Sequence, residues 1–154
     1  MEIGAFCLMP NHFHLLLQEI TAGGIAKFMQ KVGTSYGMYF NSKYERTGNV
    51  FVKPFRSRHV DDDIYLRHVA SYIHLNPADL FEPQWKGGVL PNATNLLRQL
   101  EEYPYSSLGL YADRGRPERT ILSRTAQDFL KELLPPFAMA LNEAIAYYGE
   151  MPDE

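Results

Sequence analysis

The sequence predicts an α+β domain that begins with two short strands and continues mostly as helices. Residues 2–8 and 12–18 are apolar and strand-like, and the turn-forming residues 9–11 between them predict an antiparallel hairpin. Apolar residues then recur at three- and four-residue spacing over 21–44, as in an amphipathic helix. The length of 154 residues and the apolar fraction of 45% fit a globular chain with a sizeable core.

The helix over 21–44 is expected to begin at the capping residue Thr21 and to turn an aromatic stripe toward the core. The stripe consists of Ile25, Phe28, Met29, Val32, Tyr36, Tyr39 and Phe40. A strand is expected over 49–60, where Pro54 confines it to an edge or a bulge. Arg56 and Arg58 share one face of that strand and suit phosphate oxygens, although charge on an edge strand also serves simply to prevent unwanted pairing.

The rest of the chain has helical patterns. A helix over 62–76 begins at consecutive aspartates, which suit a helix N-terminus, and ends before a proline. Shorter helices are predicted at 95–102, at 123–134 with Ser123 as the cap, and at 137–148. The last two helices either complete the core or bind a partner, and their pattern leaves both possibilities open.

Two histidines and three residues of the helix over 62–76 carry the candidate chemistry. His12 and His14 are two residues apart on a strand, so both imidazoles project from one face and can chelate one metal ion. His68, Tyr72 and Asn76 follow one another at four-residue steps and therefore share one helix face.

Two neutral imidazoles and an amide oxygen form a three-ligand set that fits Mg²⁺ or Mn²⁺ without choosing between them. Such an ion acts as a Lewis acid on a phosphodiester, and Tyr72 beside it is a candidate nucleophile. The alternative is that these residues have purely structural roles. His74 falls off the face that Tyr72 and Asn76 share, and it is expected to be structural.

Positive charge is concentrated in the middle of the chain. Residues 27–59 carry seven lysines and arginines against one glutamate, a net charge of +6. The remainder carries eight against seventeen acidic residues, a net charge of −9. A basic segment in an acidic chain predicts a phosphate-binding face, and an ordinary solvated surface is the alternative.

Several classes of protein are not expected. No run of eighteen apolar residues is present, so we expect no membrane span, and no signal-peptide pattern occurs. The sequence has no Walker-type loop, no Gly-x-Ser-x-Gly elbow and no cysteine pair for zinc. The single cysteine, Cys7, is expected to be a buried thiol in a reducing compartment, which predicts a cytoplasmic protein.

Four segments resemble the motifs of the single-tyrosine HUH transposases, most closely those of the REP-associated tyrosine transposases. The segments at 9–16, 46–51, 72–77 and 103–107 are MPNHFHLL, RTGNVF, YIHLNP and YPYSS, in the order of the family. The resemblance runs from residue 3 to residue 111, and residues 112–154 add little to it.

The resemblance implies that His12 and His14 bind a divalent metal ion, that Asn76 completes the site and that Tyr72 is the nucleophile. It implies cleavage and rejoining of single-stranded DNA near palindromic hairpins through a 5′-phosphotyrosine intermediate. No ATP is required, because that intermediate keeps the phosphodiester energy. The basic segment would face DNA, and the enzyme would be a monomer or a homodimer. The candidate DNA contacts are Lys43, Arg46, Lys53, Arg56, Arg58 and His68.

The implied fold is a ferredoxin-like α+β domain over 1–111, with an antiparallel sheet and packed helices, followed by a helical C-terminal extension over 112–154. Family members usually have a strand and a helix before the hairpin, whereas Met1 here lies at the first strand of the hairpin. We therefore expect the first strand and helix of the family fold to be missing, which would expose a sheet edge and lower stability.

Three other functions remain open. A catalytically weak or inactive remnant would bind DNA hairpins without forming the phosphotyrosine. A related nickase that starts rolling-circle replication or plasmid transfer fits less well, because the chain is short and has one candidate tyrosine. A globular domain with a structural histidine pair is the third.

Overall fold

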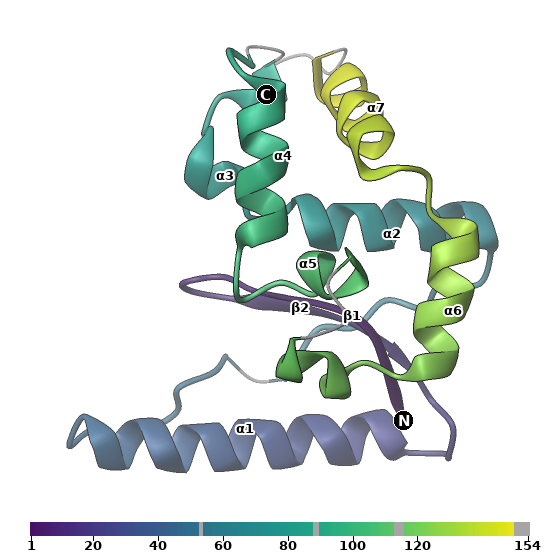
Figure 1. Cartoon of the computed structure of the whole chain (residues 1–154). Coiled ribbons are helices and arrows are strands. Elements are labelled where there is room, and N and C mark those ends of the chain that lie inside the picture. Colours follow the sequence, from purple (N-terminus) through teal and green to yellow (C-terminus); the bar gives the residue numbers. More distant parts are fainter. Residues whose placement is uncertain (53, 88–89, 113–115, 150–154) are drawn as a thin grey trace. The chain divides into compact units, whose positions relative to one another are not determined.

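The structure, a computed structural model, covers the chain in four stretches, which are 1–52, 54–87, 90–112 and 116–149. The chain divides into two compact units. The first consists of Met1–Glu2 and Leu17–Val60, and the second of Ile3–Leu16 and Asp61–Glu154. The elements confirm the α+β class (Figure 1). Within the four stretches, no helix is both long enough and apolar enough to cross a bilayer.

The predicted hairpin is present. Strands β1 (Glu2–Leu8) and β2 (Phe13–Gln18) pair with each other, and the N–H of Met9 donates to the carbonyl of His12 at 2.8 Å to close the tip. Strand β1 is apolar at consecutive positions because both faces of the hairpin are covered within the second unit. Ala5 and Cys7 pack against Ile73, whereas Phe6 on the other face packs against Leu110 and Leu122. This sheet of two strands is smaller than the ferredoxin-like sheet that the family resemblance implies.

The segment 103–107, which carries the YPYSS motif, covers the outer edge of β1. The N–H of Leu8 donates to the carbonyl of Tyr105 at 2.8 Å, and the N–H of Ser107 donates to the carbonyl of Phe6 at 2.9 Å. Buried backbone groups of an edge strand need such partners. The YPYSS motif therefore acts as a short additional pairing segment for the sheet.

Helix α2 (Asp63–Leu75) crosses the hairpin, as Figure 1 shows. The side chain of Asp62 caps its N-terminus, which confirms the capping role expected from the aspartate run. Ile73 packs against Ala5 and Cys7, and all three are buried. Burial raises the pKa of the Cys7 thiol to about 12, which confirms the expected buried thiol.

The rest of the second unit is helical, and the predicted helices at 95–102, 123–134 and 137–148 are all present. The elements in chain order are α3 (Ala78–Phe81), η1 (Trp85–Gly87), α4 (Ala93–Glu102), α5 (Leu108–Ala112), η2 (Pro117–Ile121), α6 (Arg124–Leu133) and α7 (Phe137–Gly149). The Ser123 side chain caps α6 as predicted, by accepting a hydrogen bond from the N–H of Ala126.

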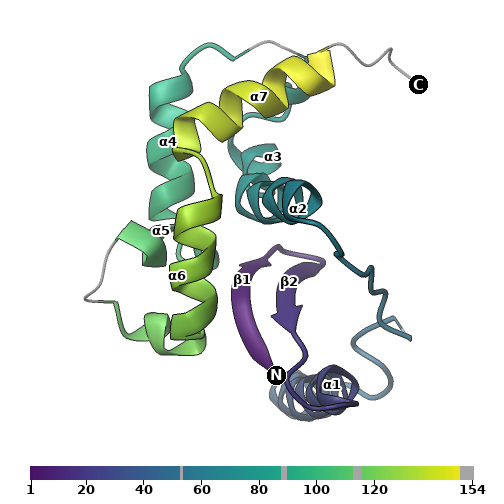
Figure 2. The same cartoon turned by 90° about the vertical axis from the view of Figure 1, so that its right-hand side faces the viewer.

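Helix α7 completes the core of the second unit. Figure 2 shows it lying over α2 and beside α4. Its residue Leu141 is fully buried in a cluster with Leu75 of α2, Trp85 of η1 and Leu96 of α4. Of the two roles that the sequence left open for this helix, the structure therefore supports core formation.

The first unit contains α1 (Gly24–Lys43), which starts later than the predicted Thr21. Gly23 is the N-cap and has a φ of 75°, a left-handed conformation that glycine adopts without strain. The expectation that the aromatic stripe of this helix is core is wrong, because none of its residues is buried. Tyr36 is instead 44% exposed.

The aromatic side chains of the first unit pack on one another. The ring of Phe40 lies 6.0 Å from that of Tyr36 and 4.6 Å from that of Tyr44, measured between centroids. The ring of Tyr36 also lies 5.4 Å from that of Phe51, which follows the helix. These contacts hold the segment after α1 against the helix, without a buried core.

The predicted strand over 49–60 is wrong. The described residues of that range, which leave out residue 53, form bends and irregular backbone. A strand is stable only when a neighbouring strand satisfies its backbone groups, and Pro54 has no N–H to donate. The side-chain amide of Asn41 instead donates to the carbonyl of Gly48 at 2.8 Å, which fixes the turn after α1.

Replacing Leu141 with alanine tests whether α7 belongs to the core. We expect Leu141→Ala to lower the free energy of unfolding by roughly 2–5 kcal/mol, because it leaves a cavity among buried side chains. Met139 on the same helix is 54% exposed, so Met139→Ala should change the free energy of unfolding by less than about 0.5 kcal/mol. Urea unfolding followed by circular dichroism measures both, and equal effects would contradict a core role.

Candidate active site

The tip of the hairpin and the C-terminal end of α2 meet in the second unit. His12 directly precedes β2, and Asn76 follows the last residue of α2. The Nε2 atom of His12 lies 3.2 Å from the Oδ1 atom of Asn76. Asn76 is 8% exposed, so its amide is held in place by the surrounding protein. These two residues are 64 positions apart in the sequence, and the fold brings their polar atoms into contact.

His14 and Tyr72 join the same cluster. The His14 ring lies 5.0 Å from the His12 ring and 5.2 Å from the Tyr72 ring, and both pairs pack edge to face. The Tyr72 side chain is 45% exposed, so a ligand can approach it from solvent. The structure therefore brings together all four residues in which the sequence suggested metal and nucleophile chemistry.

One donor atom of this cluster is buried without a partner. The Nε2 atom of His14 has no hydrogen bond within the described residues. Burial, and then the neighbouring imidazole of His12, lower the pKa of His14 below its ordinary value. The ring is therefore neutral at pH 7 with a lone pair available. Leaving a buried polar atom unpaired costs about 1–3 kcal/mol, a cost that a bound cation would remove.

The hydrogen-bond pattern of His12 also fits a cation. Its Nδ1 atom lies 2.7 Å from the Oδ1 atom of Asn11, and its Nε2 atom faces the Oδ1 atom of Asn76. A neutral imidazole carries one N–H, so only one of its two nitrogens can donate to a facing amide oxygen. At the other nitrogen two lone pairs face each other, unless a cation or a second proton lies between the two atoms. Adjacent ligands of an octahedral Mg²⁺ are about 3.0 Å apart, close to the 3.2 Å observed.

The donor set consists of two imidazole nitrogens and one amide oxygen. Among the residues that the structure covers, no group of three His, Cys, Asp or Glu side chains could hold a metal ion. The amide oxygen of Asn76, 3.2 Å from His12 Nε2, could add a third protein ligand to the two imidazoles. Mixed nitrogen and oxygen donors with open positions suit an ion that must also accept phosphate oxygens.

The candidate DNA-binding residues fall into four groups. His68 lies on α2 one turn before Tyr72 and is exposed. Arg56 and Arg58 are exposed in the irregular part of the first unit. Lys53 lies outside the described residues.

The other two candidates, Lys43 and Arg46, lie beside aromatic rings of the first unit. The Lys43 amine is 5.4 Å from the centroid of the Tyr44 ring, and the Arg46 guanidinium is 5.6 Å from the centroid of the Phe40 ring. Cations over ring faces are held in position yet keep their charge in solvent.

Two features of the site were not predicted from the sequence. Asn11 was assigned only to the turn, although its position next to His12 was a signal for a role in orienting the imidazole. His74 was expected to be structural, and the structure adds its partner, because its Nε2 atom lies 2.8 Å from the hydroxyl of Ser107. Burial lowers the pKa of His74 to about 4, so this imidazole is neutral at pH 7.

Replacing His14 with leucine tests whether the unpaired Nε2 atom of His14 lowers the stability of the metal-free chain. We expect His14→Leu to raise the free energy of unfolding of the metal-free chain by about 1 kcal/mol, because it removes a buried unpaired nitrogen. His12 is exposed, so His12→Leu should leave that free energy nearly unchanged. Both are measured by urea unfolding in EDTA. A destabilised His14→Leu chain would mean that the imidazole already has a stabilising partner.

Comparison with known proteins agrees with the geometry of this cluster. The profile of a family described as "Transposase IS200 like" matches residues 1–76, which are 76 of the 154 residues and include the whole cluster. No curated protein and no solved structure matches the chain significantly. The hairpin, the histidine pair and the tyrosine helix all lie in the matched region, so residues 1–76 are similar to the IS200-like transposases.

Proposed function

We propose that this chain is a transposase that cleaves and rejoins single-stranded DNA beside palindromic hairpins, in a metal-dependent reaction with Tyr72 as the nucleophile. The observation that carries the proposal is the contact of His12 Nε2 with Asn76 Oδ1, together with the packing of the His14 ring against the rings of both His12 and Tyr72. A metal-ligand set beside an accessible phenol is the arrangement that phosphodiester transfer through tyrosine needs.

In this proposal His12, His14 and Asn76 hold one divalent ion, Mg²⁺ or Mn²⁺. When bound, the ion supplies Lewis-acid stabilisation of the negative charge that develops on the phosphate oxygens. Asn11 orients the imidazole of His12 through its contact with Nδ1, which leaves Nε2 directed at Asn76. The buried position of Asn76 keeps its oxygen in place while the phosphate is exchanged.

Tyr72 carries out the transfer step. Its phenolic oxygen forms a bond to the phosphorus as the bond from phosphorus to the 3′ oxygen breaks. The phenol proton is released to solvent, and the leaving oxygen takes up a proton to become a free 3′-hydroxyl. The products are a 5′-phosphotyrosine and a 3′ end, and attack by a 3′-hydroxyl on the phosphotyrosine reverses the step. One phosphodiester replaces another, so no ATP is consumed.

The charged residues of the first unit would supply the nonspecific affinity for DNA. The net charge of +6 over residues 27–59 attracts the phosphate backbone. Lys43, Arg46, Arg56 and Arg58 are exposed and able to reach phosphates, and aromatic neighbours such as Tyr39 offer ring faces to bases. His68, one turn before Tyr72 on α2, would contact the strand next to the scissile phosphate.

Substituting Tyr72 tests the nucleophile. The chain is incubated with single-stranded hairpin DNA and Mn²⁺, and a protein–DNA species that resists SDS is measured. Tyr72→Phe removes one oxygen, so we expect adduct formation to fall at least about 10³-fold. EDTA should also abolish the adduct in the unmodified chain.

Tyr65→Phe, on the same helix two turns earlier, is the matched control and should form the adduct normally. Adducts that persist in Tyr72→Phe and vanish in Tyr65→Phe would assign the nucleophile to Tyr65. DNA binding without any adduct in the unmodified chain would favour a hairpin-binding protein that has lost catalysis.

The salt dependence of DNA binding tests the phosphate contacts. We expect Arg56→Ala and Arg58→Ala each to reduce the slope of log K against log salt concentration by about one unit, because each arginine releases one counterion. Arg98 pairs with Glu102 on α4 and serves as the control, so Arg98→Ala should leave the slope unchanged. Fluorescence anisotropy between 50 and 200 mM salt measures the slopes, and equal slopes in all variants would remove the arginines from the interface.

A further inference from the structure

A chain of buried hydrogen bonds links α2 to the middle of β1. The Nε2 atom of His74 lies 2.8 Å from the Oγ atom of Ser107. That oxygen accepts a hydrogen bond from the N–H of Phe6 at 2.9 Å and lies 3.1 Å from the carbonyl oxygen of Phe6. His74 is 2% exposed and Ser107 is 0% exposed, so water does not compete with these bonds.

The network pairs both buried side chains in either tautomer of His74. The Nε2 atom either donates to the Ser107 hydroxyl or accepts its hydrogen, and the hydroxyl oxygen also accepts from the N–H of Phe6. The N–H of Ser107 donates separately to the carbonyl of Phe6. Such a completed buried network favours one relative position of the two elements that it joins.

The two elements are the ones that carry the candidate active site. Tyr72 and Asn76 flank His74 by two residues on either side along α2. β1 pairs with β2, which bears His14, and the hairpin tip bears His12. A shift of α2 along the hairpin would break the bond to Ser107 and would also separate Asn76 from His12.

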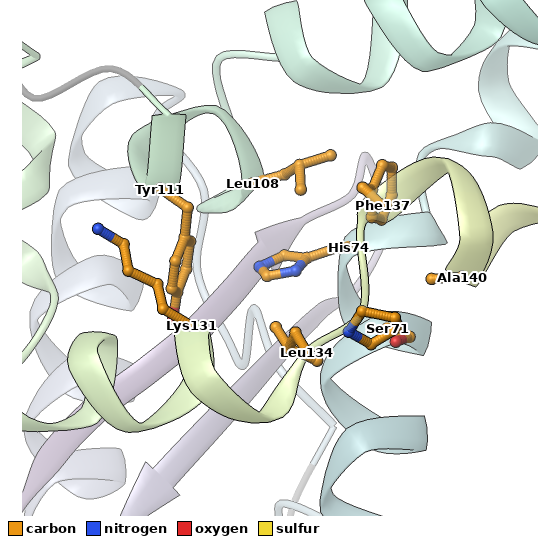
Figure 3. Close-up of a pocket in the computed structure, with 9 residues that line it drawn as sticks. Ser71, His74, Leu108, Tyr111, Lys131, Leu134, Phe137 and Ala140 are labelled. Carbon is orange, nitrogen blue, oxygen red and sulfur yellow. The ribbon is translucent and has the colours of Figure 1, made fainter.

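The His74 ring also lines a pocket of about 190 Å³, whose other walls are formed by residues of α5, α6 and α7. Figure 3 shows the ring between Tyr111 on one side and Phe137 on the other. Both aromatic rings pack edge to face against it, at centroid distances of 5.5 Å and 6.4 Å. The ring is therefore clamped between two aromatic side chains.

We propose that His74 and Ser107 are a positioning pair that sets Tyr72 and Asn76 against the two histidines of the hairpin. This inference rests on the proposed function, since the pair acts through those residues and touches neither metal nor DNA. It gives the YPYSS motif a role beyond covering the edge of β1, because its last serine is the anchor for the nucleophile helix.

The test compares full-length variants by two measurements. Proton NMR in EDTA measures the chemical shifts of the His14 imidazole protons, which depend on the ring current of the neighbouring Tyr72 ring. The Tyr72→Leu variant gives the reference chemical shifts in the absence of that ring. The initial rate of adduct formation with hairpin DNA and Mn²⁺ reports activity. We expect His74→Ala to lose the Tyr72-dependent shift and to slow adduct formation about 10–100-fold, the usual effect of removing a group that orients metal ligands.

Added imidazole should restore both readouts in His74→Ala, because the enlarged pocket admits it beside Ser107. Ser107→Ala should lose the same shift and gain nothing from imidazole. Leu141→Ala, destabilised in a core cluster that contains neither His74 nor Ser107, should keep the shift and the rate at temperatures where it is folded. If His74→Ala does not fold, His74→Gln replaces it and should retain most of the shift, since its amide can donate to Ser107.

The inference is overturned if folded His74→Ala keeps the His14 shift and the adduct rate, or if Leu141→Ala loses both to the same extent. The inference is also overturned if His74→Gln folds normally but lacks the Tyr72-dependent shift of the His14 protons. Failure of the proposed function has a different signature, in which neither the unmodified chain nor Leu141→Ala forms an adduct. The NMR comparison still decides on the positioning pair in that case.

Discussion

The packing of Ile73 against Ala5 and Cys7 determines which turn of α2 lies over which residues of the hairpin. Tyr72 precedes Ile73 directly and Asn76 follows three residues later, so this apolar contact places the polar groups as well. If the helix shifted along its axis by one turn, its side chains would move by about 5.4 Å. The 3.2 Å contact between His12 and Asn76 would then be lost. The chemistry of the site is thus fixed by the core beneath it.

The site is also where stability and chemistry oppose each other. Among the described residues, the buried side-chain atoms without a hydrogen bond are His14 Nε2 and Gln127 Oε1. The His74–Ser107 network behind the same helix is by contrast complete. The buried imidazole of His74 is therefore paired, whereas the imidazole of His14 in the candidate site keeps an unpaired nitrogen. Unpaired polar groups in an otherwise satisfied interior commonly mark functional positions.

Features set by neighbouring residues could be predicted from the sequence. Asp62 and Ser123 cap helices where the pattern placed them, and the His12–His14 spacing gave two imidazoles side by side. The strand over 49–60 was wrong because a strand depends on a partner that local pattern does not supply. The His74–Ser107 bond joins residues 33 positions apart, and no local pattern indicates such a contact.

Because the Cys7 thiol is buried and unreactive, the native chain is well suited to chemical labelling at a cysteine introduced elsewhere. Only the thiolate reacts with maleimides or disulfides, and a pKa of about 12 leaves roughly one thiolate in 10⁴ at pH 8. Cys7 is also the single cysteine of the sequence. A cysteine introduced at an exposed position would therefore be the one reactive thiol of the folded protein, and fluorophores or spin labels could be attached there without first removing Cys7.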